Sequence, residues 1–193
     1  MKTTIAAVRG RQIWDSRGRP TVEAEVTLAG GVTGRAMAPA GASRGAHEAI
    51  DRRDGGERFG GLGVEKAVAA VNGEIARLLT GRDAADQAGV DEAMIAADGT
   101  PNLARLGGNA TVAVSLAALH AAAAAEGLPL WAHLAQGRRV RIPLPEIQIF
   151  GGGAHAGRRT DVQDFMIMTP RAATIREAFE ITADVFRAAG RLM

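Results

Sequence analysis

The stretch that decides the fold is TVEAEVTLAGGVTGRAMA, from Thr21 to Ala38. Its first eight residues alternate between polar and apolar side chains, the period of a strand with one buried face. The apolar positions are Val22, Ala24, Val26 and Leu28. Gly30-Gly31 supplies a turn, and residues 32–38 can return as the antiparallel partner. With a further strand over residues 3–13, the sequence predicts a three-stranded antiparallel sheet.

Helical periodicity follows this sheet. Apolar residues recur at spacings of three and four between Val64 and Leu78, which predicts a helix that stops at Gly81. Asp83 is a candidate cap for a second helix that runs to about Ala97. Asn109 is a candidate N-cap for a long alanine-rich helix, which glycine and proline end at residues 127 and 129. Residues 1–138 are therefore predicted to form an α+β domain.

The composition shifts between Arg138 and Pro145, and residues 139–193 are predicted to begin a second domain. Two short apolar runs, residues 144–150 and 162–168, flank a glycine-rich loop. A capping box from Thr174 to Glu177 then opens a helix with an apolar side. Two strands and one helix cannot cover their own apolar faces. We therefore expect this second part to be truncated.

The composition excludes several classes of protein. The 193 residues are 47% hydrophobic and 23% charged, which is ordinary for a globular chain. Cysteine is absent, and no apolar run approaches the roughly 20 residues that span a bilayer. The pI of 9.9 arises from arginines scattered among acidic residues, and aromatic residues make up only 4%. We therefore predict a cytoplasmic protein with no membrane span and no nucleic-acid partner.

Three segments carry residues suited to chemistry. Residues 40–48, AGASRGAHE, combine small residues with polar groups; without a family resemblance, a flexible surface loop is the favoured interpretation. Residues 151–157, GGGAHAG, allow close backbone approach to an anion, with His155 near the middle; a tight turn is the alternative. In Gln163-Asp164-Phe165-Met166, Asp164 near the end of an apolar strand is either a paired structural carboxylate or a site residue.

The glycine segment also matches the dinucleotide pattern GxGxxA, from Gly151 to Ala156. That fingerprint requires a helix that opens at its last position, so that the pyrophosphate lies on the helix N-terminus. Here residues 157–160 lead into another strand-like run. The sequence therefore argues against a Rossmann unit.

The order and spacing of eight segments resemble the enolase family. Residues 15–23, DSRGRPTVE, resemble the DSRGNPTVE signature near the start of enolases, and residues 39–48 resemble the loop PSGASTGxHE. Six further matches follow in order, at residues 53–55 (RDG), 98–100 (DGT), 106–110 (LGGNA), 114–117 (VSLA), 152–156 (GGAHA) and 163–166 (QDFM). The resemblance covers the whole chain without a large gap.

The resemblance implies an enolase N-terminal α+β domain followed by the first strands and helix of a β/α barrel. It implies a carbon–oxygen lyase that dehydrates 2-phosphoglycerate to phosphoenolpyruvate with Mg²⁺ as cofactor. In that chemistry a lysine removes a weakly acidic proton, and two metal ions neutralise the charge that develops. A phosphorylated small-molecule substrate and a homodimer are further expectations from the resemblance.

The resemblance also assigns residues. Ser43 matches the loop serine that ligates the substrate-associated Mg²⁺, and Ala42 lies beside it in the substrate-binding loop. His155 matches the histidine that closes over the substrate, and Asp164 takes the place of a glutamate near the leaving hydroxyl, with Gln163 beside it. His155 and Asp164 are therefore the expected catalytic residues. The base lysine, the general acid and the other metal ligands belong to barrel parts outside residues 1–193.

Departures from the family pattern gather at these same segments. Asp164 is one methylene shorter than glutamate, and Ala40 and Arg44 replace serine and threonine in the loop. Three interpretations remain open. The chain is part of an enolase, or of a paralogue that makes a related enol phosphate such as carboxyphosphonoenolpyruvate in phosphonate biosynthesis. The third is a non-catalytic interaction protein with the enolase fold.

Overall fold

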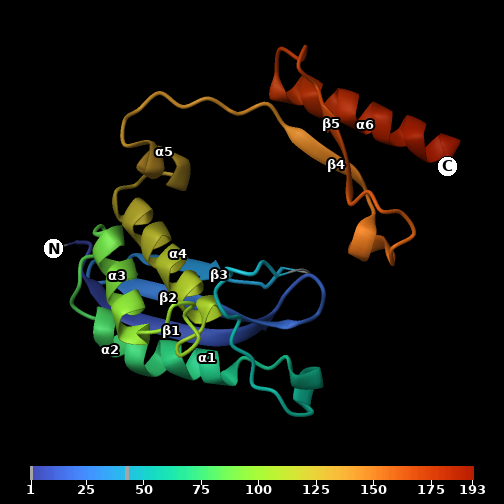
Figure 1. The fold of residues 1–193 in the computed structure, drawn as a ribbon. Helices are drawn as coiled ribbons and strands as arrows, with labels where there is room; N and C mark the ends of the chain where they lie inside the picture. Colours follow the sequence, from blue (N-terminus) through green and yellow to red (C-terminus); the bar gives the residue numbers. More distant parts are fainter. Residues whose placement is uncertain (1, 42–43) are drawn as a thin grey trace. The chain divides into compact units, whose positions relative to one another are not determined.

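The computed structural model describes residues 2–41 and 44–193, apart from the side chains of residues 154 and 155. The chain folds into two compact units, Met1–Gly137 and Arg138–Met193 (Figure 1). The first unit is a sheet covered by helices. The second is a two-stranded sheet with one long helix.

A three-stranded antiparallel sheet with the order β1-β2-β3 forms the base of the first unit, as predicted. Its strands are β1 (Ile5–Trp14), β2 (Pro20–Leu28) and β3 (Thr33–Met37). The predicted apolar face of β2 is fully buried, but the opposite face is less exposed than its alternation indicated. Glu23 is only 4% exposed because Arg11 and Arg35, from the two neighbouring strands, lie 3.3 and 3.5 Å from its carboxylate oxygens.

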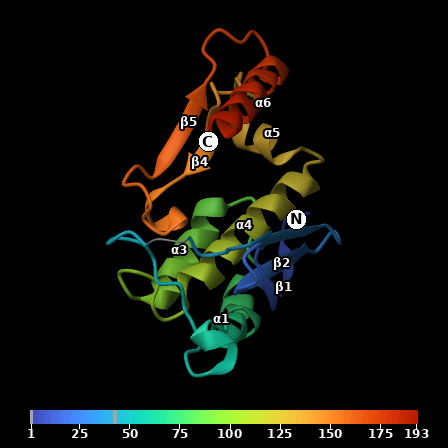
Figure 2. The same ribbon diagram turned by 90° about the vertical axis from the view of Figure 1, so that its right-hand side faces the viewer.

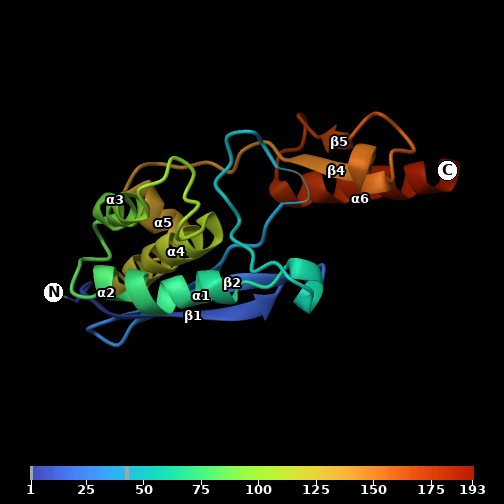
Figure 3. The same ribbon diagram turned by 60° about the horizontal axis from the view of Figure 1, so that its bottom comes forward.

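Helices cover one face of this sheet (Figure 3). The predicted first helix is continuous, but it consists of α1 (Glu65–Ala70), a π-helical turn η2 (Val71–Ile75) and α2 (Ala76–Leu79). After it come α3 (Gln87–Asp98) and α4 (Gly108–Ala125), which lie side by side (Figure 2). A short helix, α5 (Leu130–Ala135), was not predicted. In the described part of the long loop before α1, the one helical element is the 3-10 turn η1 (Arg58–Gly61).

Two predicted helix caps are wrong. The cap of α3 is Asp86, whose side chain accepts the Gly89 N–H, whereas Asp83 accepts the Ala85 N–H in the preceding turn. The cap of α4 is Gly107, which has a φ of 102°. Asn109 lies inside α4, where its side chain is used for a contact distant in sequence that is described below.

An asparagine side chain covers part of the outer edge of β1. Asn72, within the π-helical turn, donates to the Gly10 carbonyl at 2.9 Å and accepts the Gly10 N–H at 2.7 Å. Gly10 has no Cβ, and one built there would lie 2.8 Å from the Cβ of Val71. The absence of a side chain at Gly10 thus lets the helix approach the strand closely enough for both bonds.

The alanine-rich helix α4 packs directly on the sheet. A Cβ at Gly34 of β3 would collide with the Ala117 carbonyl oxygen and the Ala121 nitrogen, and would lie 2.8 Å from the Ala121 Cα. Of the described helices, α4 alone has the length and apolarity of a membrane span, but 61% of it is buried inside this unit. Here α4 is the core helix of an α+β domain.

The second unit contains β4 (Glu146–Gly151), β5 (Asp164–Met168) and α6 (Ile175–Leu192), with β4 and β5 antiparallel. Thr174 caps α6 by accepting the Glu177 N–H, and the Glu177 carboxylate accepts the Ala173 N–H, so the predicted capping box is present. Only Ala178 and Thr182 of α6 are buried. Phe165, Phe179 and Phe186 are 42–55% exposed, so the apolar side of this unit is largely uncovered.

Replacing Gly34 by alanine should force β3 and α4 apart. Because the added methyl meets backbone atoms that cannot rotate away, we expect G34A to lower the free energy of unfolding by about 3 kcal/mol. Urea unfolding monitored by circular dichroism measures this. Gly73→Ala is the matched control: its nearest foreign atom lies 4.0 Å away in the helix, so it should stabilise the fold by about 0.5–1 kcal/mol. Equal stability of the two variants would contradict the packing argument.

Candidate functional site

The turn between β1 and β2 holds the start of the loop at residues 39–49. Asp15 accepts the N–H groups of Arg17 and Arg19, both at 2.9 Å, and pairs with the Arg17 guanidinium at 3.0 Å. The N–H of Arg19 has the largest effect on the pKa of Asp15 and lowers it. Burial raises this pKa, but the N–H and the guanidinium of Arg17 lower it further, so that it lies below its usual value. The oriented Arg17 guanidinium then donates to the Ala40 carbonyl. The DSRG segment thereby fixes one end of the loop.

Arg53 fixes the other end. Its Nε donates to Asp51 Oδ2 at 2.6 Å, and its Nη1 donates to the carbonyls of Pro20 and Leu62 at 2.5 and 2.7 Å. The side chains of Arg53 and Asp51 are only 15% and 12% exposed. One guanidinium therefore joins the start of β2 to the segments before and after η1.

Asn109 connects the loop region to the helical core. Its Oδ1 accepts the Arg52 N–H at 3.2 Å, and its Nδ2 donates to the Arg52 carbonyl at 3.1 Å. The neighbouring Gly108 allows close approach, since a Cβ there would lie 2.8 Å from the Ala49 Cβ. Asn109, predicted as a helix cap, instead pairs with backbone 57 residues earlier in the chain.

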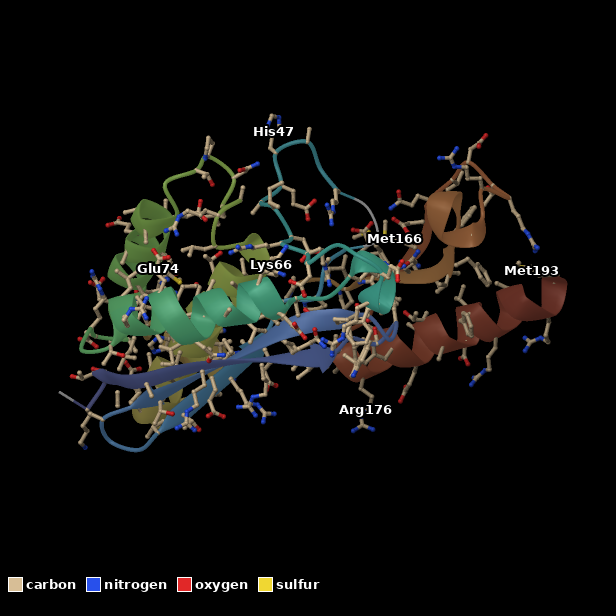
Figure 4. All side chains as sticks on the ribbon, turned by 90° about the horizontal axis from the view of Figure 1, so that it is seen from below. His47, Lys66, Glu74, Met166, Arg176 and Met193 are labelled. Atoms are coloured by element: carbon tan, nitrogen blue, oxygen red, sulfur yellow. The ribbon has the colours of Figure 1, made fainter. Side chains whose placement is uncertain are left out.

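A cleft of about 370 Å³ opens between this loop and the start of α4. We call it the loop cleft. Its lining includes Pro39, Gly41, Arg44, Asp51, Asn109 and Val112. The Glu48 carboxylate, also in the lining, accepts the Gly45 N–H at 2.7 Å and so closes a turn within the loop. His47 lies at the tip of the loop and points away from the sheet (Figure 4).

The second unit places a carboxylate at the start of β5. Asp164 Oδ1 accepts the Gln148 side-chain amide at 2.5 Å, and Oδ2 accepts the Gln163 amide at 3.3 Å. Gly152 lies so close to the Val162 carbonyl and Thr160 that a Cβ would collide with both. These contacts orient the Asp164 carboxylate beside the glycine-rich loop.

The glycine-rich loop is not a dinucleotide-binding turn. Residues 153–156 form one 3-10 turn, η3 (Gly153–Ala156), and the chain continues to a strand antiparallel to β4. A Rossmann unit instead requires a helix at this point and a parallel strand after it. The sequence-based argument against that interpretation is therefore confirmed.

The predicted site residues are divided between the two units. Gln163 and Asp164 are in hydrogen-bond contact in the second unit. Ala42, Ser43 and the side chain of His155 lie outside the described residues. Arg44 of the loop lines the loop cleft and lies 3.5 Å from Asp51.

Sequence reasoning did not identify Arg17 and Arg53 as residues that fix the loop. Both occur within quoted motifs, DSRG and RDG, but the carbonyls they bind are between 9 and 33 residues away. A motif identifies such an arginine without showing which backbone atoms it contacts. The tertiary structure supplies that information.

No group of three histidine or acidic side chains gathers to hold a metal ion among the residues that the structure describes. Mg²⁺ prefers several oxygen ligands in octahedral geometry. The described residues therefore do not form a metal centre by themselves.

Two family models match the chain. The model described as "Enolase, N-terminal domain" matches residues 5–134, about two thirds of the sequence. The model described as "Enolase, C-terminal TIM barrel domain" matches residues 139–193. These ranges agree with the sheet-and-helix unit and with the strand-strand-helix unit described above.

The lowered pKa of Asp98 leads to a prediction about how the stability of the fold depends on pH. Burial raises this pKa, but the Leu106 N–H at 2.6 Å, the hydroxyl and N–H of Thr100 and the charge of Arg105 together lower it below its usual value. A carboxyl with a lowered folded-state pKa stabilises the fold above about pH 4 and loses that contribution as the pH falls through the folded-state pKa.

We therefore expect Asp98→Asn to cost about 1–3 kcal/mol of unfolding free energy at pH 7, and the difference from the wild type to shrink below pH 4. Urea unfolding at a series of pH values measures this difference. Glu92→Gln, at an exposed position of the same helix, is the control and should change stability little at any pH. A pH-independent difference for D98N would contradict the assignment.

Proposed function

The chain belongs to the enolase family, and from this premise we propose that the full-length protein is a lyase that dehydrates 2-phosphoglycerate to phosphoenolpyruvate. The observation that carries the proposal is the Asp164 carboxylate, which two glutamine side chains orient at the start of β5. The substrate would be a phosphorylated small molecule. A homodimer in the cytoplasm, inferred from the family resemblance, is part of the same proposal.

In this proposal the residues of the chain bind and orient the substrate. Asp164 would accept a hydrogen bond from the departing hydroxyl, with its carboxylate held in place by Gln148 and Gln163. His155, in the glycine-rich loop, would close over the substrate and exclude water. Ala42 and Ser43 would contact the substrate from the loop that Arg17 and Arg53 anchor.

Magnesium would be held jointly. Ser43 would supply one oxygen ligand, and barrel residues outside residues 1–193 would supply the others. When bound, Mg²⁺ supplies positive charge that offsets the negative charge formed on the substrate carboxylate. Neither lysine of the chain matches the base of the reaction: Lys2 is exposed, and Lys66 donates to the Asp54 carbonyl at 3.0 Å. Figure 4 shows Lys66 near the start of the first helix.

A second candidate has its own supporting observation. Asp164 and Arg44 both depart from the family pattern, and Arg44 brings a guanidinium into the lining of the loop cleft. A paralogue that makes a related enol phosphate, such as carboxyphosphonoenolpyruvate, fits these departures. A non-catalytic protein of this fold is the third candidate, and a full-length sequence without a base lysine and metal-binding carboxylates would favour it.

The first test is turnover. We expect the full-length protein to form phosphoenolpyruvate from 2-phosphoglycerate in the presence of Mg²⁺. Ultraviolet absorbance measures the formation of the product, which should stop when a chelator removes the metal. The 193-residue chain is the control and should be inactive, because neither of its lysines matches the base that removes the proton in the family. A folded, Mg²⁺-binding full-length protein without turnover would refute the enolase activity and favour the paralogue.

The second test concerns Asp164. In the full-length protein Asp164→Asn should lower kcat about 100-fold with little change in KM. The amide has the same size but carries no negative charge, and its nitrogen cannot accept a hydrogen bond as the second carboxylate oxygen does. Steady-state kinetics measure the two constants. Asp161→Asn is the matched control, since this nearby exposed carboxylate should leave both constants unchanged. A kcat of D164N within threefold of the wild type would remove Asp164 from the proposed machinery.

A further inference from the structure

The segment that connects the two compact units along the chain is irregular and exposed. The first unit ends at Gly137, and residues 138–145 then form no helix, strand or turn before β4 begins (Figure 1). Val140 and Ile142 are 53% and 72% exposed, although both are apolar. We call residues 139–142, with the sequence RVRI, the linker site.

The backbone of the linker site has no hydrogen-bond partner within the part of the chain that the structure describes. In that same part, no carboxylate pairs with Arg139 or Arg141. Ile142 precedes Pro143, and the proline ring favours an extended backbone in the residue before it. The peptide bonds of the linker site are therefore accessible to a second molecule, and the sequence itself favours an extended conformation there.

Other arginines in the loops of the second unit lie in turns that hydrogen bonds close. Arg158 has a φ of 60° and donates its N–H to the Gly153 carbonyl at 2.7 Å. Arg171 lies in a turn that the Ala172 N–H closes by donating to the Thr169 carbonyl at 3.0 Å. A second molecule that binds an extended chain must first open such a turn, which costs free energy of local unfolding. The linker site requires no such opening.

Arg44 of the first unit is also exposed, but the peptide group after it is held. The Gly45 N–H donates to the Glu48 carboxylate at 2.7 Å. The loop that contains Arg44 is in addition fixed at its two ends by Arg17 and Arg53. The linker site therefore combines exposed arginines with a backbone that is ready to bind, and Arg44 does not.

We propose that the linker site is a processing site, at which an arginine-specific endoprotease hydrolyses the peptide bond after Arg139 or Arg141. Both arginines are exposed, so that a guanidinium can enter the acidic specificity pocket of such a protease. In the reaction the C–N bond breaks, and water adds its hydroxyl to the arginine carbonyl carbon and a proton to the nitrogen of Val140 or Ile142. This inference does not depend on the proposed lyase activity.

Cleavage at the linker site should leave the first unit folded. The buried cluster that forms its core runs from Ile5 to Ala122 in sequence, so that every member precedes the linker site. The three-stranded sheet and the helices on it keep all their mutual contacts after the cut. The product is therefore a stable domain that ends at residue 139 or 141.

Limited digestion of the full-length protein with clostripain, an arginine-specific endoprotease, tests the proposal. Mass spectrometry of samples taken over time identifies each cut. We expect the first cut within residues 1–193 to follow Arg139 or Arg141, and the fragment that begins at Met1 to persist. The double variant R139Q/R141Q keeps the length of the linker and removes both recognised side chains. Cutting within residues 1–193 should then become at least about 10-fold slower, because the remaining bonds require local unfolding.

Arg187→Gln is the matched control. It removes an exposed arginine that is paired with Asp184 inside α6, where the helix protects the peptide bond, so that cutting at the linker site should stay as fast as in the wild type. A first cut after Arg44 or Arg158 would overturn the proposal, as would rapid degradation of the first unit. The same holds if R139Q/R141Q is cut elsewhere within residues 1–193 as fast as the wild type is cut at the linker site. Melting temperatures show whether each variant is folded, and the position of the first wild-type cut decides the question if the double variant is not.

Discussion

Backbone lies directly against backbone where α4 crosses β3, because Gly34 has no side chain to separate them. This contact sets the height of α4 above the sheet and hence the position of its first turn. Asn109 in that turn pairs with the backbone of Arg52, and the adjoining residues Asp51 and Arg53 order the base of the loop. The position of the loop cleft's α4 wall thus depends on the absence of a side chain at Gly34.

The sheet and the helices of the first unit follow from local patterns. Alternation of β2 and the Gly30-Gly31 turn were enough to predict the hairpin. Apolar spacings of three and four predicted the first helix, and candidate caps and helix-ending residues predicted the next two. The details that failed depend on contacts distant in sequence. Asparagine is a residue type that often caps helices, but the Asn109 side chain pairs with backbone 57 residues away, and Gly107 is the cap. Glu23 has the pattern of an exposed residue, but arginines from both neighbouring strands cover it.

The candidate site could be predicted only in part for the same reason. The order of the motifs identified the loop and the Gln163-Asp164 pair, because both contain residue types that match the family pattern. It did not reveal that Arg17 and Arg53 fix the two ends of the loop through backbone carbonyls, since a carbonyl has no signature in sequence. Nor could it show that Asp51 serves two arginines through one oxygen. The structural effect of a residue that departs from the family pattern can be judged only when its hydrogen-bond and ion-pair partners are known.

The Asn72 side chain has a consequence for how the protein avoids aggregation. Gly10 lies opposite Ala24 in the sheet, and its N–H and carbonyl are both taken by Asn72 on the side away from β2. An edge strand with free backbone groups is a template for another chain. The π-helical turn brings an amide to this edge that imitates the hydrogen bonding of a neighbouring strand. At this position β1 cannot recruit a fourth strand from a second molecule, although the sheet remains open.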